Sequence, residues 1–359
     1  MKQFFKGIHW PIVCLTVGIT ISSFFFIYSA TFRSDEEYMT KQLTWFAVAV
    51  IAFVSAIGLG YRKFLNASQF LYWMSIVILI LVPIIGYARK GAHRWISVGG
   101  FTLQPSEFCK LATILMLAQF LADRARTMGQ KRSFALGALL TLIPFFLIVK
   151  QPDLGTALTF IPMLIGMLLV WGIRFRYLFA VFLTGLSSLP FLWFMLKPYQ
   201  QKRLLVFVNP DADPLGSGYT AVQSKIAVGA GGLIGKGWLH GTQTQLDFVP
   251  EHHTDFIFCV VGEEFGFLGS LFLILLFCSL IGYFIQVMER TTDIRARVLA
   301  AGITSVFFFQ VMVNIGMTIG IAPITGITLP LVSYGGSSLI TTYLAIGLLV
   351  SIHKERSIF

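Results

Sequence analysis

The sequence contains little charge. Charged residues make up only 12% of its 359 residues, whereas hydrophobic residues make up 56%. Soluble domains carry about 25% charged residues, so this composition excludes an ordinary soluble protein. The apolar runs are continuous and do not alternate with polar residues, which excludes a transmembrane β-barrel. Since helices are the remaining way to cross a bilayer, the sequence predicts an all-α, polytopic membrane protein.

Cysteines are few, and a nucleotide-binding motif is missing. The four cysteines lie in apolar runs and form no Cys-x-x-Cys pair, so we interpret them as small buried apolar residues. The stretch "GAGGLIGKG" offers flexible backbone N–H groups. It lacks the GxxxxGK[ST] spacing of a phosphate-binding loop, because Gly237 follows Lys236. We therefore expect no nucleotide site and no nucleic-acid partner.

Apolar runs long enough to span a bilayer, about 20 residues each, recur along the chain. We predict ten transmembrane helices in a single membrane domain that covers residues 1–359. The first run is too long for a signal peptide, and Pro323 and Pro330 divide the last run in two. The predicted spans are residues 10–30, 42–61, 64–88, 104–122, 133–149, 154–173, 177–196, 256–287 and the two parts of 298–352.

An even number of spans places both termini on one side of the membrane. Lysine and arginine are more frequent in the segments on that side than in the short loops opposite, which predicts cytoplasmic termini. The long loop 197–255, between the seventh and eighth spans, would then face outward. Its apolar patches alternate with glycine-rich turns, so we expect short amphipathic helices on the outer membrane surface.

Ionisable residues near the outer ends of the spans are the first candidates for function, because a charge in the bilayer is costly. Glu107 and Lys110 are three residues apart and share one helical face, and Arg94 and Trp95 precede them. One interpretation is a self-neutralising Glu–Lys pair with no substrate. The other is an outer cavity that binds an anion, for which gathered cations suit a phosphate or pyrophosphate.

The stretch "PEHHTDF" places Asp255 at the outer mouth of the eighth span. An aspartate there can serve as a general base or simply stabilise the start of the helix. Lys225 adds a cation in the preceding loop. His252 and His253 are adjacent, so their side chains diverge, and we do not expect them to chelate one metal ion.

Three shorter stretches also carry polar residues close to span ends. In "VGEEFGFLG", we expect Glu263 or Glu264 to point inward and pair with a cation. "KQPDLG" places Asp153 at an outward turn. "PLVSYGGSS" brings Ser333 to the outer start of the last span, where the small residues favour close helix packing.

These stretches together resemble a known family, the SEDS proteins (shape, elongation, division and sporulation). The resemblance rests on "GAHRWISVGGFTLQPSEFCK", "KQPDLGT", "QSKIAVGAGGLIGKGWLHGTQTQLDFVPEHHTDFIF", "GEEFGFLG" and "PLVSYGGSS". They follow one another in the order expected for the family, over nearly the whole chain. Within the family, "GKGWLHGTQTQLDFVPEHHTDFIF" is similar to the RodA branch, which serves cell elongation and rod shape.

The resemblance implies a ten-helix membrane glycosyltransferase. Such enzymes polymerise lipid II into glycan strands on the outer face of the bacterial cytoplasmic membrane. They work with a class B penicillin-binding protein, a transpeptidase, and with other membrane proteins of the elongation machinery. The family's essential acidic residue corresponds to Asp255, the arginine of its RWI segment to Arg94, and the Glu and Lys of QPSExxK to Glu107 and Lys110.

We expect an inverting displacement with Asp255 as the base that activates the acceptor hydroxyl. Arg94, Trp95, Glu107, Lys110 and Lys225 would bind the substrate, with or without a divalent cation. Two other functions fit the same composition. One is a lipid II flippase, although the singled-out charges all lie on the outer half and no inverted repeat is evident. The other is a non-enzymatic scaffold, which has no need of these ionisable residues.

Overall fold

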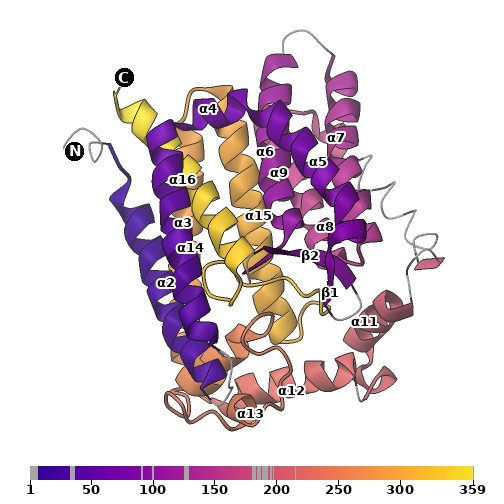
Figure 1. Cartoon of the computed structure of the whole chain (residues 1–359), viewed down its shortest axis with the longest axis vertical. Helices are drawn as coiled ribbons and strands as arrows, with labels where there is room; N and C mark the ends of the chain where they lie inside the picture. The colour runs from indigo at the N-terminus through magenta and orange to yellow at the C-terminus, as the bar shows by residue number, and fades with distance from the viewer. Residues whose placement is uncertain are drawn as a thin grey trace.

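The apolar runs of the sequence form long helices that lie side by side in one bundle (Figure 1). The computed structural model describes residues 7–32, 37–89, 92–98, 101–124, 129–179, 183, 187, 193–194, 196, 198–214 and 216–358. The bundle consists of α2 (Trp10–Thr31), α3 (Tyr38–Leu59), α5 (Ser68–Ile85), α6 (Pro105–Arg124), α7 (Gln130–Lys150), α8 (Leu154–Leu158), α9 (Phe160–Trp171), α14 (Ile257–Arg290), α15 (Ile294–Thr318) and α16 (Gly336–Ile358), with the short α4 (Tyr61–Asn66) between α3 and α5.

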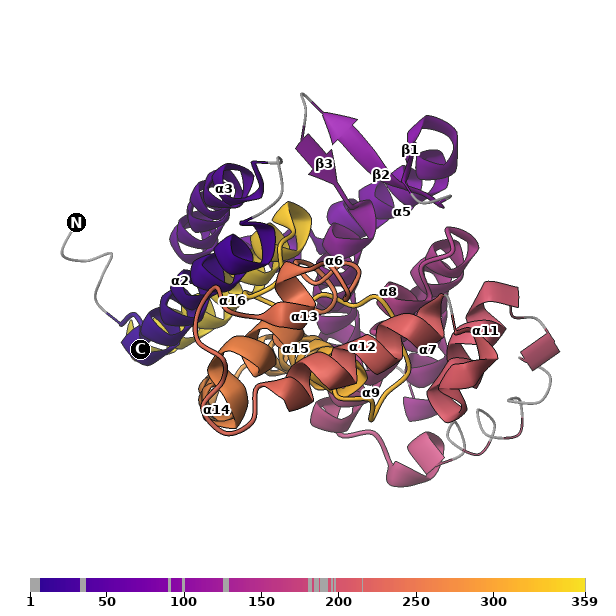
Figure 2. The same cartoon turned by 90° about the horizontal axis from the view of Figure 1, so that it is seen from below.

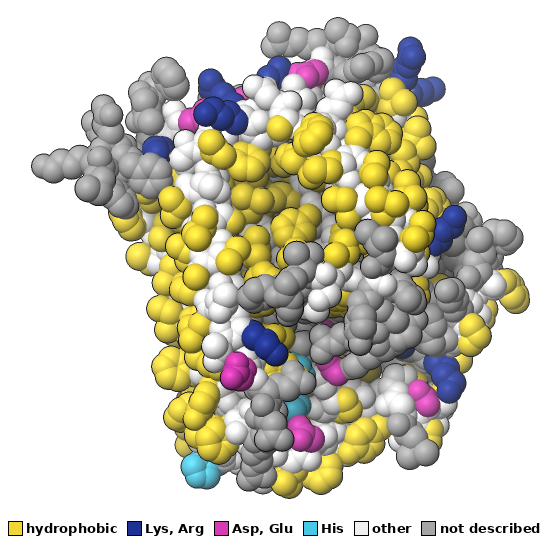
Figure 3. Space-filling model, viewed as in Figure 1, with side chains coloured by type: hydrophobic (Ala, Val, Ile, Leu, Met, Phe, Trp, Pro, Cys, Tyr) yellow, Lys and Arg dark blue, Asp and Glu magenta, His cyan; other side chains and the backbone are white. Residues whose placement is uncertain are grey.

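The helices confirm a polytopic helical membrane protein. Within the described residues, seven helical segments are long and apolar enough to cross a membrane, and a shorter apolar helix covers Ser68–Ile84. On the face seen in Figure 3, a broad zone of hydrophobic side chains covers much of the bundle, and charged side chains lie above and below its middle. The predicted span 177–196 lies largely outside the described residues, so the count of ten stays a prediction.

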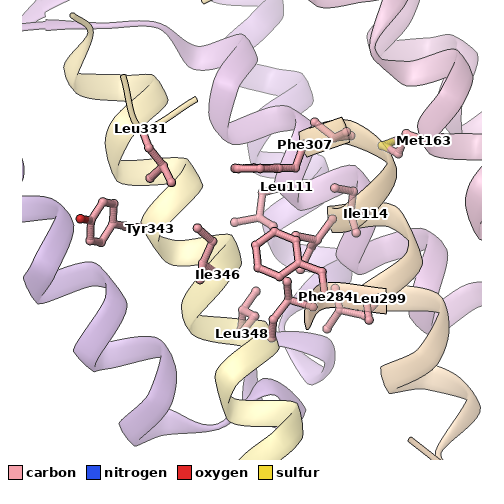
Figure 4. Packing of buried hydrophobic residues seen from close by; sticks show 14 of the residues in the cluster. Leu111, Ile114, Met163, Phe284, Leu299, Phe307, Leu331, Tyr343, Ile346 and Leu348 are labelled. Carbon is pink, nitrogen blue, oxygen red and sulfur yellow. The ribbon is translucent and has the colours of Figure 1, made fainter. Parts of the chain in front are cut away.

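The centre of the bundle is built on α15 and α16. In each, 78% of the most apolar stretch is buried, compared with 28% in α3, α7 and α14, so α15 and α16 are enclosed while the others face outward. Figure 4 shows side chains from α6, α9, α14 and α16 packed around α15. The labelled residues include Leu111, Ile114, Met163, Phe284, Leu299, Phe307, Ile346 and Leu348.

The break predicted inside the last apolar run is confirmed. α15 ends at Thr318 and α16 begins at Gly336, and residues 319–335 between them form no helix. Pro323 and Pro330 explain why a helix cannot continue, because proline removes a backbone N–H donor and clashes with the preceding turn. This segment, here called the 319–335 linker, becomes one wall of the site described below.

A small antiparallel sheet, which the sequence did not lead us to expect, follows α5. It contains β1 (Tyr87–Arg89), β2 (Ala92–Val98) and β3 (Phe101–Leu103) in the order β1-β2-β3, with Ile96 opposite Leu103. The predicted span 64–88 accordingly ends as a helix at Ile85. Branched and aromatic residues in "AHRWISVGGFTL", with a Gly-Gly pair in the middle, are typical of a hairpin and were the signal for it.

The loop 197–255 forms short helices, as predicted. These are α11 (Pro198–Val208), the 3-10 turn η1 (Pro210–Ala212), α12 (Ser217–Ala230) and α13 (Thr242–Gln245). They gather at the end of the bundle opposite the start of α2 and the end of α16 (Figure 1), and α12 lies across the ends of α14 and α15 (Figure 2). At the start of α12, the backbone N–H and hydroxyl of Ser217 hold the pKa of Asp213 below its usual range.

The glycine-rich stretch 231–237 packs against a break in α14 and exchanges backbone hydrogen bonds with it. The helix is interrupted at Gly266, which has φ 64° and ψ −159°. The N–H groups of Lys236 and Gly237 donate to the carbonyls of Glu263 and Glu264, at 3.0 and 2.9 Å. In return, residues 267 and 268 donate to the carbonyls of residues 232 and 233, at 2.9 and 3.1 Å. The N–H groups of Lys236 and Gly237, which the sequence offered as free donors, are therefore used inside the protein.

Replacing Gly266 with alanine should destabilise the protein by at least about 1–3 kcal/mol, the usual cost of a backbone conformation that only glycine adopts easily. An added Cβ would also lie 2.3 Å from the backbone nitrogen of Gly235. Thermal unfolding of the purified protein in detergent measures the loss. The control is Gly282→Ala in the same helix, where no atom lies within 4 Å of the added Cβ. Equal stability of the two variants would contradict the close packing of residues 231–237 against Gly266.

Candidate functional site

A polar cavity of about 240 Å³ lies where β2, residues 251–255 and the 319–335 linker meet. Arginine, carboxylate, hydroxyl and aromatic groups line it together, so it offers charges of both signs beside ring faces. Its lining is Trp45, Arg94, Trp95, Thr102, Gln104, Asp153, Arg203, Glu251, His253, Thr254, Asp255, Gly326, Thr328, Tyr334, Gly335, Gly336, Ser337 and Ser338. We call it the Asp255 cavity.

Asp255 projects into this cavity from the turn that precedes α14. The N-cap position of the helix is Phe256, so Asp255 does not occupy the capping position that was one of its two interpretations. Glu251 begins the turn with a φ of 55°, and its carbonyl accepts the N–H groups of Thr254 and Phe256 at 3.1 and 3.3 Å. Such a left-handed conformation in a non-glycine residue costs energy and tends to occur at functional sites.

Gly326 marks the point where the side chains of Asp255 and Arg203 come close to the same segment of backbone. A Cβ on Gly326 would lie 3.4 Å from Oδ2 of Asp255 and 3.8 Å from Nη1 of Arg203. The carboxylate and the guanidinium therefore approach the same point of the 319–335 linker from two sides. The φ of Gly326 is +74°, which adds to the reasons for a glycine at this position.

Arg203 is a site residue that the sequence did not reveal. It lies on α11, within the long loop, where it counted only as one loop cation among several. Its neighbour Lys202 is an exposed residue that pairs with Asp213 at 3.6 Å, so of the two cations only Arg203 lines the cavity. No sequence motif distinguishes them, because the choice depends on how the loop folds against the linker.

Arg94 and Trp95 line the Asp255 cavity from β2, and their predicted binding of substrate stays a prediction. The guanidinium of Arg94 lies 3.6 Å from Asp153, and its side chain is 30% exposed. Asp153 also accepts a hydrogen bond from Gln104 at 2.8 Å and caps α8 through the N–H of Thr156 at 3.2 Å. Asp153 thus anchors one wall of the cavity and balances part of the charge of Arg94.

Glu107 and Lys110 do not line the Asp255 cavity. They form a buried ion pair at 2.8 Å beside a separate cavity of about 40 Å³ between α6, α15 and α16. The hydroxyl of Thr341 donates to Glu107 at 3.5 Å, and Ser337 of the Asp255 cavity lies one turn before Thr341 on α16. The two cavities are therefore neighbours along one helix. The predicted pair on one helical face is confirmed, and its place in the substrate site stays a prediction.

Lys225 also lies elsewhere. It is an exposed residue of α12 beside a cavity of about 20 Å³ that it shares with Arg203, and its aliphatic stem packs over Gly320. Arg203 lines both this cavity and the Asp255 cavity. Lys225 therefore lines a different cavity from Asp255, and its predicted binding of substrate stays a prediction.

The expectation that the two histidine side chains diverge is wrong, because their rings meet edge to face with centroids 5.8 Å apart. The ring of His253 lies tilted against that of Tyr38, with centroids 4.7 Å apart, and lines the cavity. His252 is buried and places its ring nitrogens 2.6 Å from the carbonyl of Ala30 and 2.9 Å from that of Val249. Within the described part of the chain, no three His, Cys, Asp or Glu side chains are arranged to hold a metal ion. The divalent cation stays an expectation that would need substrate phosphates as ligands.

Glu263 confirms the expectation of an inward carboxylate paired with a cation. It is fully buried and lies 2.8 Å from Nζ of Lys236. Its oxygens also accept the backbone N–H groups of Thr242, Gln243 and Thr244, at 2.7, 2.8 and 3.0 Å. These are the first residues of α13, so the carboxylate binds the N-terminus of that helix. Glu263 is therefore a structural link between the loop and α14 and lies outside the Asp255 cavity.

The fold and the cavity define a multi-pass helical membrane protein with a polar site at one end of its bundle. A family model described as "Cell cycle protein", that of FtsW, RodA and SpoVE, matches residues 8–358. The chain belongs to this family, which confirms the resemblance seen in its motifs.

Relatives and solved structures agree over almost the whole chain. The peptidoglycan glycosyltransferase MrdB of Escherichia coli (strain K12) is 37% identical over 358 residues, which cover 99% of this chain and 96% of that protein. The peptidoglycan glycosyltransferase RodA of Treponema pallidum (strain Nichols) is 33% identical and covers 95% and 96%.

Among solved structures, a chain from a peptidoglycan synthase complex that coordinates polymerization and crosslinking has a TM-score of 0.85 at 32% identity, covering 98% of this chain and 99% of that chain. The rod shape determining protein RodA of Thermus thermophilus has a TM-score of 0.75 at 30% identity, covering 98% of each.

Removing the carboxylate of Asp153 should loosen the wall that carries Arg94. Asp153→Ala removes a helix cap and leaves Gln104 without its buried acceptor, which we expect to cost about 2 kcal/mol. Thermal unfolding in detergent is the measurement. The matched control is Asp211→Ala, an exposed carboxylate of η1, which should change stability by less than about 0.5 kcal/mol. A similar small effect at Asp153 would mean that it does not anchor the wall.

Proposed function

We propose that this chain, a peptidoglycan glycosyltransferase of the FtsW/RodA/SpoVE family, polymerises lipid II into β-1,4 glycan strands by an inverting displacement. The observation that carries the proposal is the approach of Asp255 and Arg203 to one point, Gly326, in a cavity that Arg94 also lines. Glycosyl transfer from a pyrophosphate needs a base for the acceptor and cations for the leaving group. The Asp255 cavity contains both.

Asp255 is the proposed general base. Its side chain takes the proton of the acceptor's 4-hydroxyl as the oxygen attacks the anomeric carbon of the donor sugar. The bond from that carbon to the pyrophosphate breaks on the opposite face, so the configuration inverts in a single step. A free aspartate has a pKa near 3.9 and is ionised at neutral pH, and general-base assistance is typically worth about 10²–10⁴-fold in rate.

Arg94 and Arg203 are the proposed partners of the pyrophosphate. The leaving group gains negative charge as the bond breaks, and guanidinium groups bind phosphate oxygens in bidentate geometry. Asp153, 3.6 Å from Arg94, balances part of the charge of Arg94, whereas Arg203 approaches Gly326 together with Asp255. Trp45, Trp95 and Tyr334 give the same cavity aromatic faces on which sugar rings can pack.

The cellular setting follows from the family. The site would face outward from the bacterial cytoplasmic membrane, with both chain termini in the cytoplasm, because the start of α2 and the end of α16 lie at the opposite end of the bundle (Figure 1). A class B penicillin-binding protein is the proposed partner, which fits the similarity to a chain of a polymerising and crosslinking synthase complex. Other membrane proteins of the elongation machinery complete the assembly.

Asp255→Asn should abolish polymerisation, because the amide keeps the shape of the side chain but cannot accept the proton. Purified variant and wild type are incubated with lipid II, and glycan strands are resolved on gels. We expect a rate at least about 100-fold lower, with unchanged thermal unfolding. Asp211→Asn, an exposed carboxylate outside the cavity, is the control and should polymerise normally. If Asp255→Asn polymerises lipid II at the wild-type rate, Asp255 is not the general base. Reconstituted liposomes that move lipid II across the bilayer without polymer would favour a flippase instead.

Arg94→Ala and Arg203→Ala should each weaken engagement of the pyrophosphate. We expect kcat/KM for lipid II to fall at least about tenfold, the effect of losing one charge-assisted contact of roughly 1.5–3 kcal/mol. Lys202→Ala removes a cation next to Arg203 in sequence but outside the cavity, and should leave kcat/KM within twofold. If both arginine variants behave like Lys202→Ala, the leaving-group assignment is wrong.

A further inference from the structure

Three consecutive carbonyls beside the proposed base are each held by a separate donor. The carbonyl of His253 accepts the N–H of Tyr334 at 3.1 Å, and that of Thr254 accepts the hydroxyl of Ser333 at 2.6 Å. The carbonyl of Asp255 itself accepts Nδ2 of Asn314 at 2.7 Å. Two of the donors belong to the 319–335 linker, and the third, Asn314, projects from α15. The backbone of the catalytic turn is therefore fixed at every residue from 253 to 255.

Asn314 differs from the other two donors because it joins two segments at once. Its Nδ2 also donates to the carbonyl of Ile327 at 2.7 Å. Both contacts are to carbonyl oxygens, so the NH₂ group of the amide must face them, and both of its hydrogens are used. Ile327 follows Gly326, the residue beside which Asp255 and Arg203 meet. One amide thus sets the spacing between the catalytic turn and the wall that faces it.

The location of Asn314 argues that this role is specific. The residue is fully buried in α15, within the apolar run "VFFFQVMVNIGMT". A polar side chain inside an apolar bundle carries a desolvation cost, and an apolar residue of similar size would fill the space without it. Its Oδ1 finds no hydrogen-bond partner in the described part of the chain. The side-chain hydrogen bonds of Asn314 are therefore the two that its NH₂ group donates.

We infer that Asn314 is a positioning residue for the glycosyl transfer. By holding the backbone of Asp255 to that of Ile327, it keeps the Asp255 carboxylate beside Gly326 and Arg203. It lines none of the cavities described above. It acts through the two backbone carbonyls that it holds, those of Asp255 and Ile327. The inference rests on the proposed function, with Asp255 as base. A displacement of about 1 Å at a reacting group can cost about 10²-fold in rate, so a single bridging amide is enough to matter.

The test is to remove the donors without removing the volume. Asn314→Leu keeps the size and loses both donors, and Asn314→Asp keeps the shape and retains at most one. With purified protein and lipid II, we expect kcat to fall at least about tenfold for Leu and by less for Asp, with KM within twofold in both. Asn314→Leu should also lower the free energy of unfolding by about 1–3 kcal/mol, because the carbonyls of Asp255 and Ile327 lose their buried donor. Activity is therefore measured at a temperature where both proteins are fully folded, and there a merely structural residue would leave kcat unchanged.

The matched control is Thr304→Val in the same helix. It removes a buried hydroxyl whose hydrogen bond to the carbonyl of Ala300, at 2.7 Å, stays within α15. It should leave kcat and KM unchanged. The inference is overturned if kcat of either Asn314 variant stays within twofold of wild type, or if KM rises while kcat is kept. Asp255→Asn, assayed in parallel, separates failure of this inference from failure of the proposed function. If Asp255→Asn polymerises normally, the assignment of Asp255 as base is wrong.

Discussion

Backbone that leaves a helix inside a packed bundle must find other hydrogen-bond partners, and the rest of this structure depends on how that requirement is met. Two helices are interrupted at the same end of the bundle. The break at Gly266 is filled by residues 231–237, which exchange backbone hydrogen bonds with it. The break between α15 and α16 is filled by the 319–335 linker, whose donors hold the turn that carries Asp255. The same bonds that make non-helical backbone tolerable therefore also build the site.

The position of the site follows from this arrangement. The linker donates hydrogen bonds to the backbone carbonyls of the catalytic turn, so the two lie together. The cavity forms where they meet β2 and α11. The charges then separate between two cavities. Asp255, Arg94 and Arg203 line the larger cavity, while Glu107 and Lys110 of α6 pair with each other beside the smaller one. A cavity with two arginines and a nearby carboxylate suits an anionic leaving group and a proton acceptor at once.

Local signals in the sequence predicted much of this structure. The apolar runs indicated the helices, Pro323 and Pro330 indicated the break in the last run, and the spacing of Glu107 and Lys110 indicated their ion pair. Asp255 entered the site through the family resemblance, since position alone left it as a possible helix cap. What the sequence could not provide depends on long-range contacts. Arg203 reaches the cavity, and Lys225 does not, only because of how α11 and α12 lie on the linker.

The buried carboxylate of Glu263 has a consequence for how the molecule is assembled. It binds the first residues of α13 and Lys236, and both belong to the loop that precedes its own helix in the chain. During synthesis, that loop is made before α14, so its native partner does not yet exist. Residues 231–245 must remain without these contacts until α14 has been made. This end of the bundle is thus completed only after α14 has been added, and a chain truncated before α14 would lack the partner of its own loop.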